Sequence, residues 1–246
     1  MIFTTTNPAT EEVIATYCET DPLDVLDMIG GAEYEQLIWA KRSIEYRARI
    51  VKRLAEILIR DMEESAQLIT EEMGKPIGQS RSEILKCAET CRFIAELARV
   101  ALSSEEQEIE GARATITYAP LGVIVAIMPW NFPFWQFIRF AAPALMAGNG
   151  ILLKHAPNTL GCALKLVAMC REAGVPKELV QCFLIDVVRV ETLIGDTRVR
   201  AVTFTGSTTG GQAVSQLAAR HVKKTVLELG GNDAYIVCND ADLNVT

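Results

Sequence analysis

The first third of the chain has the apolar spacing of amphipathic helices. Between residues 43 and 73, apolar side chains recur at intervals of three and four, which is the repeat of one helix face. This spacing predicts one helix over 43–73, ended by Gly74 and Pro76, a second over 80–102, and an earlier one capped by Asp21. The acidic stretch Ser103–Glu110 is interpreted as a solvated connector, so residues 1–111 are expected to be helical.

The pattern changes at Ala112. Residues Ala112–Tyr118 alternate between apolar and polar, which predicts an exposed strand. Short apolar runs then alternate with helical segments, as in βαβ units around a parallel sheet. The expected strands are Val123–Ile127, Ile151–Lys154, Val180–Leu184, Ala201–Phe204 and Thr225–Leu229. The expected helices are Phe134–Ala147, Thr159–Glu172, Val188–Ile194 and Thr208–Ala219. The predicted fold class is therefore α/β.

The last residues are expected to belong to a further domain. Ala234–Val237 is predicted to start a strand, and Asn239–Leu243 is predicted to form a turn that leads into a helix. The chain stops at Thr246, within that expected helix, so residues 230–246 are interpreted as the start of a truncated domain.

Composition narrows the classes of partner. A net charge of −7, with no local block of lysine or arginine, argues against nucleic acid. The longest apolar segment, Leu121–Ile138, is interrupted by two prolines and an asparagine, whereas a membrane span needs roughly 20 uninterrupted apolar residues. The first residues contain no basic stretch followed by an apolar run, so no signal peptide is expected. We expect neither a nucleic-acid nor a membrane partner.

The seven cysteines are odd in number and scattered, which favours a reducing cytoplasm over a disulfide framework. Cys87 and Cys91 lie four residues apart and share one face of a predicted helix. With only two histidines in the chain, core packing is expected for this pair and no metal site is predicted.

Three loops follow predicted strands at the edge where open α/β sheets bind ligands. They span Met128–Pro133, Lys154–Asn158 and Thr205–Gly211. The third is a glycine-bearing turn at a helix N-terminus, which attracts phosphate, although a tight turn with a helix cap explains it equally well. Lys154 is either a cation for a ribose or phosphate or a solvated surface charge.

Two polar side chains are candidates for catalysis. The Asn131 carboxamide could donate to a developing oxyanion, or it could simply form a turn. Glu228 lies between Leu227 and Leu229, where partial desolvation would suit it to general-base work. The alternative is a strand-end glutamate that points into water.

Taken together, these motifs resemble the aldehyde dehydrogenase family. The resemblance rests on Pro129–Pro133, on Phe204–Thr208 with Gly211, and on Leu227–Gly231 in this order and spacing. Supporting segments are Thr6–Thr10, Glu72–Pro76 and Asp240–Leu243. The match covers nearly the whole chain but about the first half of a family member.

The resemblance implies a Rossmann-like parallel sheet with flanking helices, a preceding helical segment and a protruding β-hairpin. Residues 1–111 would be the helical part of the cofactor-binding domain, and residues 112–229 its dinucleotide-binding core. The strand near 112–119 would serve oligomerisation, giving a homodimer or homotetramer. Residues 230–246 would begin the catalytic domain.

The implied reaction is oxidation of an aldehyde substrate through a cysteine thioester, with hydride passing to NADP or NAD. Asn131 would be the oxyanion donor, and Glu228 would be the base that activates water. The dinucleotide site would comprise Met128, Pro129, Trp130, Lys154, His155, Ala156, Pro157, Phe204, Thr205, Gly206, Ser207, Gly211 and Leu229.

Three features refine this expectation. Pro157 stands where many NAD-preferring members have a glutamate, which removes a repulsion against a 2′-phosphate and makes NADP acceptable. Leu184–Asp186 replaces a glycine-containing turn, so phosphate contacts from that loop are not expected to follow the family. Arg139 resembles the arginine with which succinate-semialdehyde dehydrogenases pair a substrate carboxylate, although it could also brace its own helix.

The family's nucleophile has no counterpart in the chain. Only Cys238 follows Glu228, and it lies within a predicted strand, so it is interpreted as a core thiol. The chain alone is therefore expected to lack dehydrogenase activity. The alternative is a non-catalytic nucleotide-binding or oligomerisation module.

Overall fold

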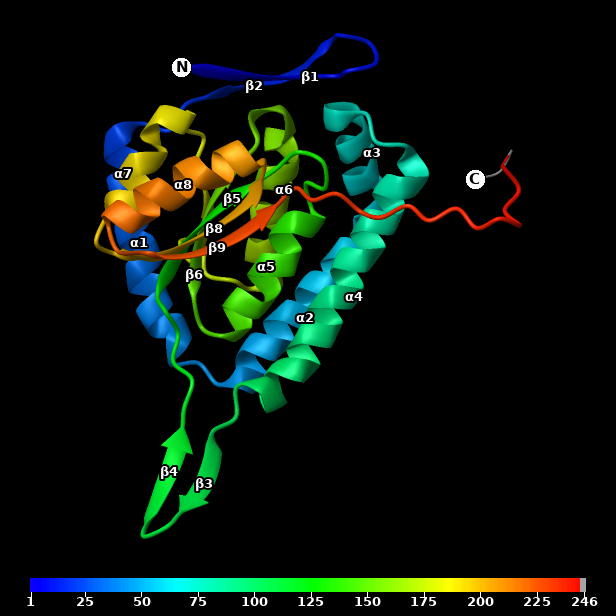
Figure 1. Cartoon of the computed structure of the whole chain (residues 1–246). Coiled ribbons are helices and arrows are strands. Elements are labelled where there is room, and N and C mark those ends of the chain that lie inside the picture. Colours follow the sequence, from blue (N-terminus) through cyan, green and yellow to red (C-terminus); the bar gives the residue numbers. More distant parts are fainter. Residues whose placement is uncertain (244–246) are drawn as a thin grey trace.

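A five-stranded parallel sheet forms the centre of the computed structural model, which describes residues 1–243 (Figure 1). The strand order is β7-β6-β5-β8-β9, and every neighbouring pair is parallel. The strands are β5 (Val123–Met128), β6 (Gly150–His155), β7 (Val180–Cys182), β8 (Val199–Gly206) and β9 (Lys224–Leu229). β5 and β6 are buried along their whole length, as strands covered on both faces must be. The predicted α/β class is confirmed.

Helices cover both faces of this sheet. One apolar core joins the sheet to the second to sixth helices and to Trp39 at the end of the first, and the other joins it to the rest of the first helix, the seventh and the eighth. Along β5 the buried side chains alternate between these cores, as the two-residue repeat of a strand requires. The helices that follow the sheet strands are α5 (Trp135–Met146), α6 (Leu160–Ala173), α7 (Val190–Gly195) and α8 (Thr208–Arg220), with short 3-10 turns at Pro157–Thr159 and Val187–Arg189.

The N-terminal part is not wholly helical, which corrects the prediction for residues 1–111. Strands β1 (Ile2–Thr6) and β2 (Val13–Cys18) form an antiparallel hairpin. Most of its side chains are exposed, so little apolar alternation marks it in the sequence. Helix α1 (Pro22–Ala40) follows and begins as predicted, because the Asp21 carboxylate accepts a hydrogen bond from the Leu23 amide at 2.8 Å.

The single helix predicted over 43–73 is two helices, α2 (Ile44–Arg60) and α3 (Met62–Met73). The break is at Asp61, whose backbone leaves the helical region with φ −100° and ψ 21°. The apolar spacing continues across this break because both helices bury one face, and spacing alone does not reveal a change of axis. Gly74 ends α3 in the left-handed conformation, as predicted. Helix α4 spans Ile77–Ala101.

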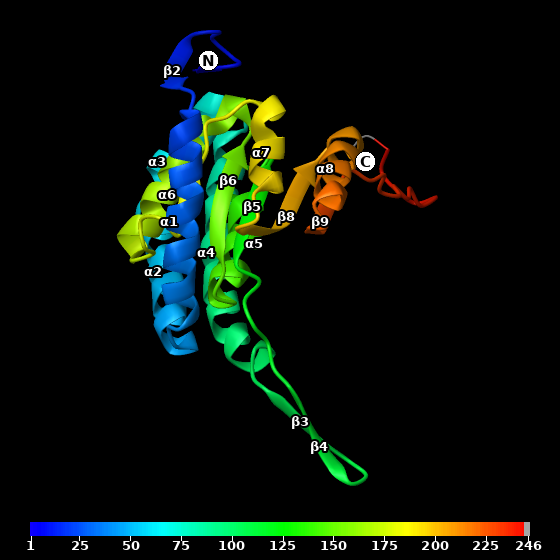
Figure 2. The same ribbon diagram turned by 90° about the vertical axis from the view of Figure 1, so that its left-hand side faces the viewer.

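The acidic stretch predicted to be a connector instead contains strand β3 (Glu105–Ile109), which pairs antiparallel with β4 (Ala112–Ile116). This hairpin projects away from the body of the molecule in two views at right angles (Figures 1 and 2). All five side chains of β3 are exposed, so nothing selects an apolar alternation there. The predicted protruding hairpin is present, with one more strand than the sequence pattern marked.

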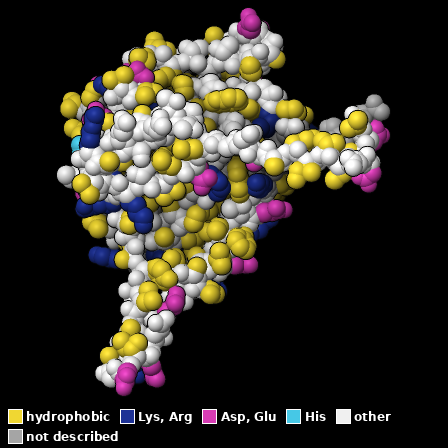
Figure 3. All heavy atoms as spheres, in the orientation of Figure 1, with side chains coloured by type: hydrophobic (Ala, Val, Ile, Leu, Met, Phe, Trp, Pro, Cys, Tyr) yellow, Lys and Arg dark blue, Asp and Glu magenta, His cyan; other side chains and the backbone are white. Residues whose placement is uncertain are grey.

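The C-terminal segment differs most from its prediction. Residues Ala234–Val237 form no strand and are exposed, since the described residues offer them no neighbouring strand. Cys238 is also exposed, so it is not a core thiol here. Apolar side chains line this projecting segment (Figure 3). The predicted turn is present at 239–240, and the helix expected after it falls outside the described residues. Within residues 1–243, no helix is long and apolar enough to cross a membrane.

Candidate functional site

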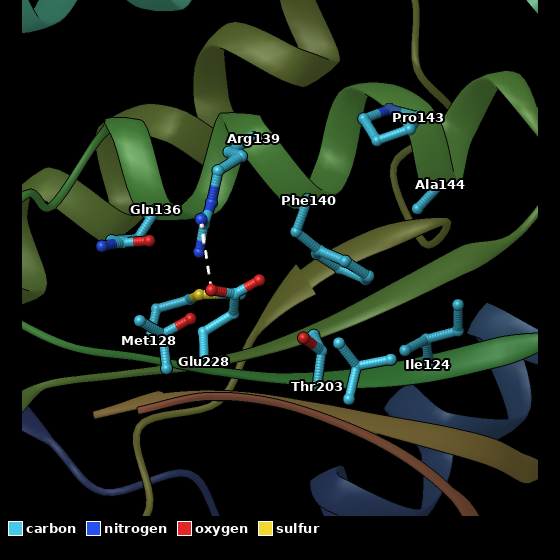
Figure 4. A pocket seen from close by; sticks show the side chains of 11 residues that line it. Ile124, Met128, Gln136, Arg139, Phe140, Pro143, Ala144, Thr203 and Glu228 are labelled. Atoms are coloured by element: carbon cyan, nitrogen blue, oxygen red, sulfur yellow. Dashed lines mark ion pairs between the residues drawn. The ribbon is translucent and has the colours of Figure 1, made fainter. Parts of the chain in front are cut away.

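Two adjoining pockets meet near the carboxyl ends of β5, β8 and β9, where Gln136, Thr205 and Glu228 line both. The loop pocket has a volume of about 370 Å³. Its lining consists of Pro129, Trp130, Asn131, Gln136, Thr205, Gly206, Ser207, Glu228, Leu229 and Gly230. The α5 pocket, of about 350 Å³, lies between α5 and the sheet (Figure 4). Its lining consists of Ile124, Met128, Gln136, Arg139, Phe140, Pro143, Ala144, Thr203, Thr205, Val226 and Glu228.

The loop pocket unites motifs that are far apart in the sequence. It brings the turn that bears Asn131 together with the glycine turn after β8 and with Glu228 on β9. The strand register explains this, because β5 pairs with β8 and Thr205 of β8 lies opposite Glu228 of β9. Both residues predicted for catalysis therefore line the same pocket.

The turn after β8 has the form expected of a helix N-terminus. Ser207 caps α8, and its hydroxyl oxygen accepts a hydrogen bond from the Gly210 amide at 3.1 Å. Gly206 must be small, because a Cβ there would lie 2.7 Å from the Phe204 ring. Gly211 is buried, and a Cβ on it would lie 2.5 Å from a Leu229 methyl carbon. Glycine at 211 therefore lets α8 pack closely on β9.

Glu228 and Arg139 form an ion pair across the boundary of the two pockets. The Arg139 side chain extends from α5 toward Glu228, with 3.4 Å between the nitrogen and the oxygen (Figure 4). The two side chains are 37% and 52% exposed. Within residues 1–243, the Glu228 side chain is therefore not desolvated as the sequence predicted. An ion pair this exposed contributes little to stability and can exchange partners readily.

The loop after β6 lies outside both pockets. Lys154 is buried rather than solvated, its ammonium donates to the His155 carbonyl at 3.4 Å, and burial lowers its pKa. The His155 side chain is 2% exposed and points into the core, and burial lowers its pKa to about 4. Pro157 is exposed, and Ala156 is partly buried. Of the residues predicted to bind the dinucleotide, Met128 and Phe204 also have buried side chains.

Sequence reasoning missed a buried carboxylate behind the Asn131 turn. Glu83 of α4 accepts hydrogen bonds from the amides of Phe134 at 2.9 Å and Trp135 at 3.0 Å, where α5 begins. Its other oxygen pairs with the buried Lys75, whose ammonium lies 3.6 Å from the centre of the Phe132 ring. Glu83 lies on the buried face of its helix, and that position was the available signal.

A second carboxylate does the same for the neighbouring helix. Glu72, 2% exposed at the end of α3, accepts hydrogen bonds from the amides of Gly161 at 2.8 Å and Cys162 at 2.9 Å. Burial raises the pKa of this carboxyl group. Carboxylates from α4 and α3 thus cap α5 and α6, the helices that follow the loops after β5 and β6. The helix dipole favours a negative charge at these N-termini.

Gln136 is a further residue that the motifs did not single out. It lines both pockets, and its side-chain oxygen is buried without a hydrogen-bond partner among the described residues. No group of three or more histidine, cysteine, aspartate or glutamate side chains within residues 1–243 is arranged to hold a metal ion.

An open parallel sheet with its cleft at the carboxyl ends of the strands defines a Rossmann-like α/β protein. The model of the aldehyde dehydrogenase family matches residues 1–246, and the chain belongs to this family. The resemblance drawn from the motifs is confirmed.

Several known proteins are similar to this chain in sequence or in structure. The succinate semialdehyde dehydrogenase [NAD(P)+] Sad of Escherichia coli is 42% identical, with 98% of this chain and 54% of that protein covered. The succinate-semialdehyde dehydrogenase [NADP(+)] of Mycobacterium leprae is 43% identical, with 99% and 54% covered. The structure of succinic semialdehyde dehydrogenase from Streptococcus pyogenes with NADP+ matches with a TM-score of 0.94 at 33% identity, covering 98% and 53%. The chain spans about half the length of these relatives.

Proposed function

We propose that this chain is the cofactor-binding half of an NAD(P)-dependent aldehyde dehydrogenase that oxidises succinate semialdehyde to succinate. The observation that carries the proposal is the loop pocket, which Asn131 and Glu228 line together. The names of the similar proteins from Escherichia coli and Mycobacterium leprae support the substrate.

The dinucleotide is proposed to be NADP or NAD. The loop pocket fits such a group for two reasons. Glycine at 206 adds no side chain to the turn after β8, and the backbone amides of the first turn of α8 attract phosphate. Trp130, Ser207 and Leu229 would hold the dinucleotide at the same pocket. When bound, its nicotinamide accepts the hydride. Pro157 carries no carboxylate that would repel a 2′-phosphate, so NADP is acceptable.

The chain's own side chains have distinct proposed roles. The Asn131 carboxamide donates a hydrogen bond to the oxyanion that develops on the aldehyde oxygen. Glu228 takes a proton from the water that hydrolyses the acyl intermediate. Arg139 pairs with the distal carboxylate of the substrate. Because Arg139 lines the α5 pocket and Glu228 lines both pockets, a short semialdehyde can place its carboxylate in the first and its aldehyde in the second.

The nucleophile is proposed to come from a catalytic domain joined to this chain. Burial raises the pKa of five thiols, which disfavours the reactive thiolate; these are Cys87, Cys91, Cys162, Cys170 and Cys182. Cys18 lies in the N-terminal hairpin, and Cys238 lies in the exposed C-terminal segment. Neither of these two cysteines lines the loop pocket, so we expect no aldehyde-dependent NAD(P)H formation by the 246 residues alone.

The codons after Thr246 test this proposal. A cysteine in a Gly-Gln-x-Cys-like context within the next fifty codons is expected, and a stop codon directly after Thr246 would favour the non-catalytic module instead. Independently, turnover by the 246-residue chain that Cys238→Ala abolishes would overturn its proposed inactivity.

The complete enzyme is proposed to be a homodimer or homotetramer, with the β3–β4 hairpin in the subunit contact. The hairpin is exposed on nearly all its residues and presents unpaired strand edges, which favour pairing with another chain. Deleting residues 105–116 from the complete enzyme is expected to give monomers in analytical ultracentrifugation. A variant that still sediments as the same oligomer as the wild type would contradict this. The cytoplasmic location stays a prediction.

A further inference from the structure

We propose that His155 is a positioning residue that ties the turn beside Asn131 to the end of β6, and thereby holds the Asn131 carboxamide in its place in the loop pocket. The inference rests on the proposed function, because it assigns Asn131 the oxyanion. His155 is the last residue of β6 and lies opposite Met128, the last residue of β5. The two loops that follow these strands therefore start side by side.

The hydrogen bonds of His155 permit one tautomer. Its Nε2 is 3.1 Å from the Pro133 carbonyl oxygen, and a carbonyl only accepts, so Nε2 must carry the proton. Its Nδ1 is 3.0 Å from the Ala156 amide, which only donates, so Nδ1 must be unprotonated. The Thr159 hydroxyl lies 2.9 Å from the same Nδ1. The His155 ring thus accepts a hydrogen bond from the loop after β6 through Nδ1 and donates one to the turn after β5 through Nε2.

Burial makes this bridge a fixed one. The ring of His155 is 2% exposed and Thr159 is fully buried, so water does not compete for either nitrogen. A second proton on Nδ1 would face the Ala156 amide hydrogen beside the Lys154 ammonium, and burial likewise keeps the pKa of His155 at about 4. The imidazole therefore stays neutral, and keeps both bonds, throughout the neutral pH range.

The opposite side of the turn is held by Glu83. Its carboxylate accepts from the amides of Phe134 and Trp135, the two residues after Pro133. Two buried side chains from different elements therefore fix residues 133–135, whereas Asn131, two residues earlier, is exposed in the pocket. The position of the Asn131 carboxamide depends on this anchored end, because Pro133 has a fixed φ and restricts the backbone of Phe132 before it. Losing the bond to Pro133 would loosen this anchored end, and with it the position of the Asn131 carboxamide.

Two substitutions in the complete enzyme test the hydrogen bonds to Pro133 and to Ala156 separately. In His155→Gln the side-chain amide nitrogen reaches the place of Nε2 and can still donate to the Pro133 carbonyl. In His155→Asn the shorter amide reaches the place of Nδ1, so it can serve Ala156 but not Pro133. We expect the glutamine variant to retain more of the kcat for succinate semialdehyde than the asparagine variant, in which kcat is expected to fall about tenfold or more. The Kd for NADP+, measured by calorimetry, is expected to change less than about threefold in both.

A double-mutant cycle with Asn131→Ala tests whether His155 acts through Asn131. If it does, His155→Asn lowers kcat in the wild-type background but has little further effect once Asn131 is alanine. Multiplicative losses in the double mutant would overturn the inference, as would an asparagine variant as active as the wild type. A His155→Asn protein that no longer binds NADP+ would also overturn it, because the bridge would then support the fold or the cofactor. If Asn131→Ala alone leaves kcat unchanged, the proposed role of Asn131 fails instead.

Discussion

Acidification provides a direct test of the buried His155 bridge. Burial lowers the pKa of His155 to about 4, whereas an unfolded histidine titrates near 6.5. Between these values the unfolded chain binds the proton and the folded chain does not, so the free energy of unfolding falls as the pH falls. The contribution is fully present above about pH 6.5 and is progressively lost toward pH 4. From pH 7 to pH 5 the loss due to this one group is about 2 kcal/mol.

The measurement compares urea unfolding of the wild type and of His155→Gln at pH 7, 6 and 5. Other groups also titrate in this range. Burial raises the pKa of Glu72, for example, which contributes the opposite slope. These groups are common to both proteins, so the difference between the two slopes isolates His155. The wild type is expected to lose about 2 kcal/mol more than the variant. Equal losses would refute the claim that the imidazole is buried and neutral.

Three further changes test the site and its supports. Arg139→Ala is expected to raise KM for succinate semialdehyde at least about tenfold while leaving KM for an uncharged aldehyde nearly unchanged, and equal effects on both substrates would contradict its role. Gly211→Ala places a Cβ 2.5 Å from a Leu229 carbon and is expected to lower the free energy of unfolding by about 1–3 kcal/mol in urea titrations; no loss would mean that α8 shifts freely. Glu83→Ala leaves the buried Lys75 ammonium unpaired, and a loss of about 3–5 kcal/mol in the same titration is expected, whereas a loss below about 1 kcal/mol would argue against the buried pair.

The sheet could be predicted from the sequence because its central strands are buried on both faces. Such strands appear as uninterrupted apolar runs, and the helices between them keep their own spacing. The hairpins at Ile2–Cys18 and Glu105–Ile116 lie mostly in solvent, so their patterns carry less information. The break at Asp61 was missed because both flanking helices bury the same kind of face.

The site was predicted in part. Motifs located most residues of the loop pocket, because the turns after β5 and β8 and the end of β9 are visible in local sequence, whereas Gln136 of α5 was missed. The supports of those turns were not visible. Glu72 and Glu83 act on amides that are about ninety and fifty residues away in the sequence, and such pairings depend on how helices pack. Lys154 was expected at the solvent boundary but is buried, because β6 is an interior strand of the sheet.

The central claim is that this chain supplies the cofactor site and the hydrolytic base of an aldehyde dehydrogenase. Rapid-mixing measurement of NADPH formation from succinate semialdehyde, in the complete enzyme with and without Glu228→Gln, tests it most directly. Hydride transfer precedes hydrolysis of the thioester, so the variant should keep a stoichiometric burst of NADPH and lose most of its steady turnover. A variant that turns over at the wild-type rate, or a wild type that forms no NADPH, would contradict the account.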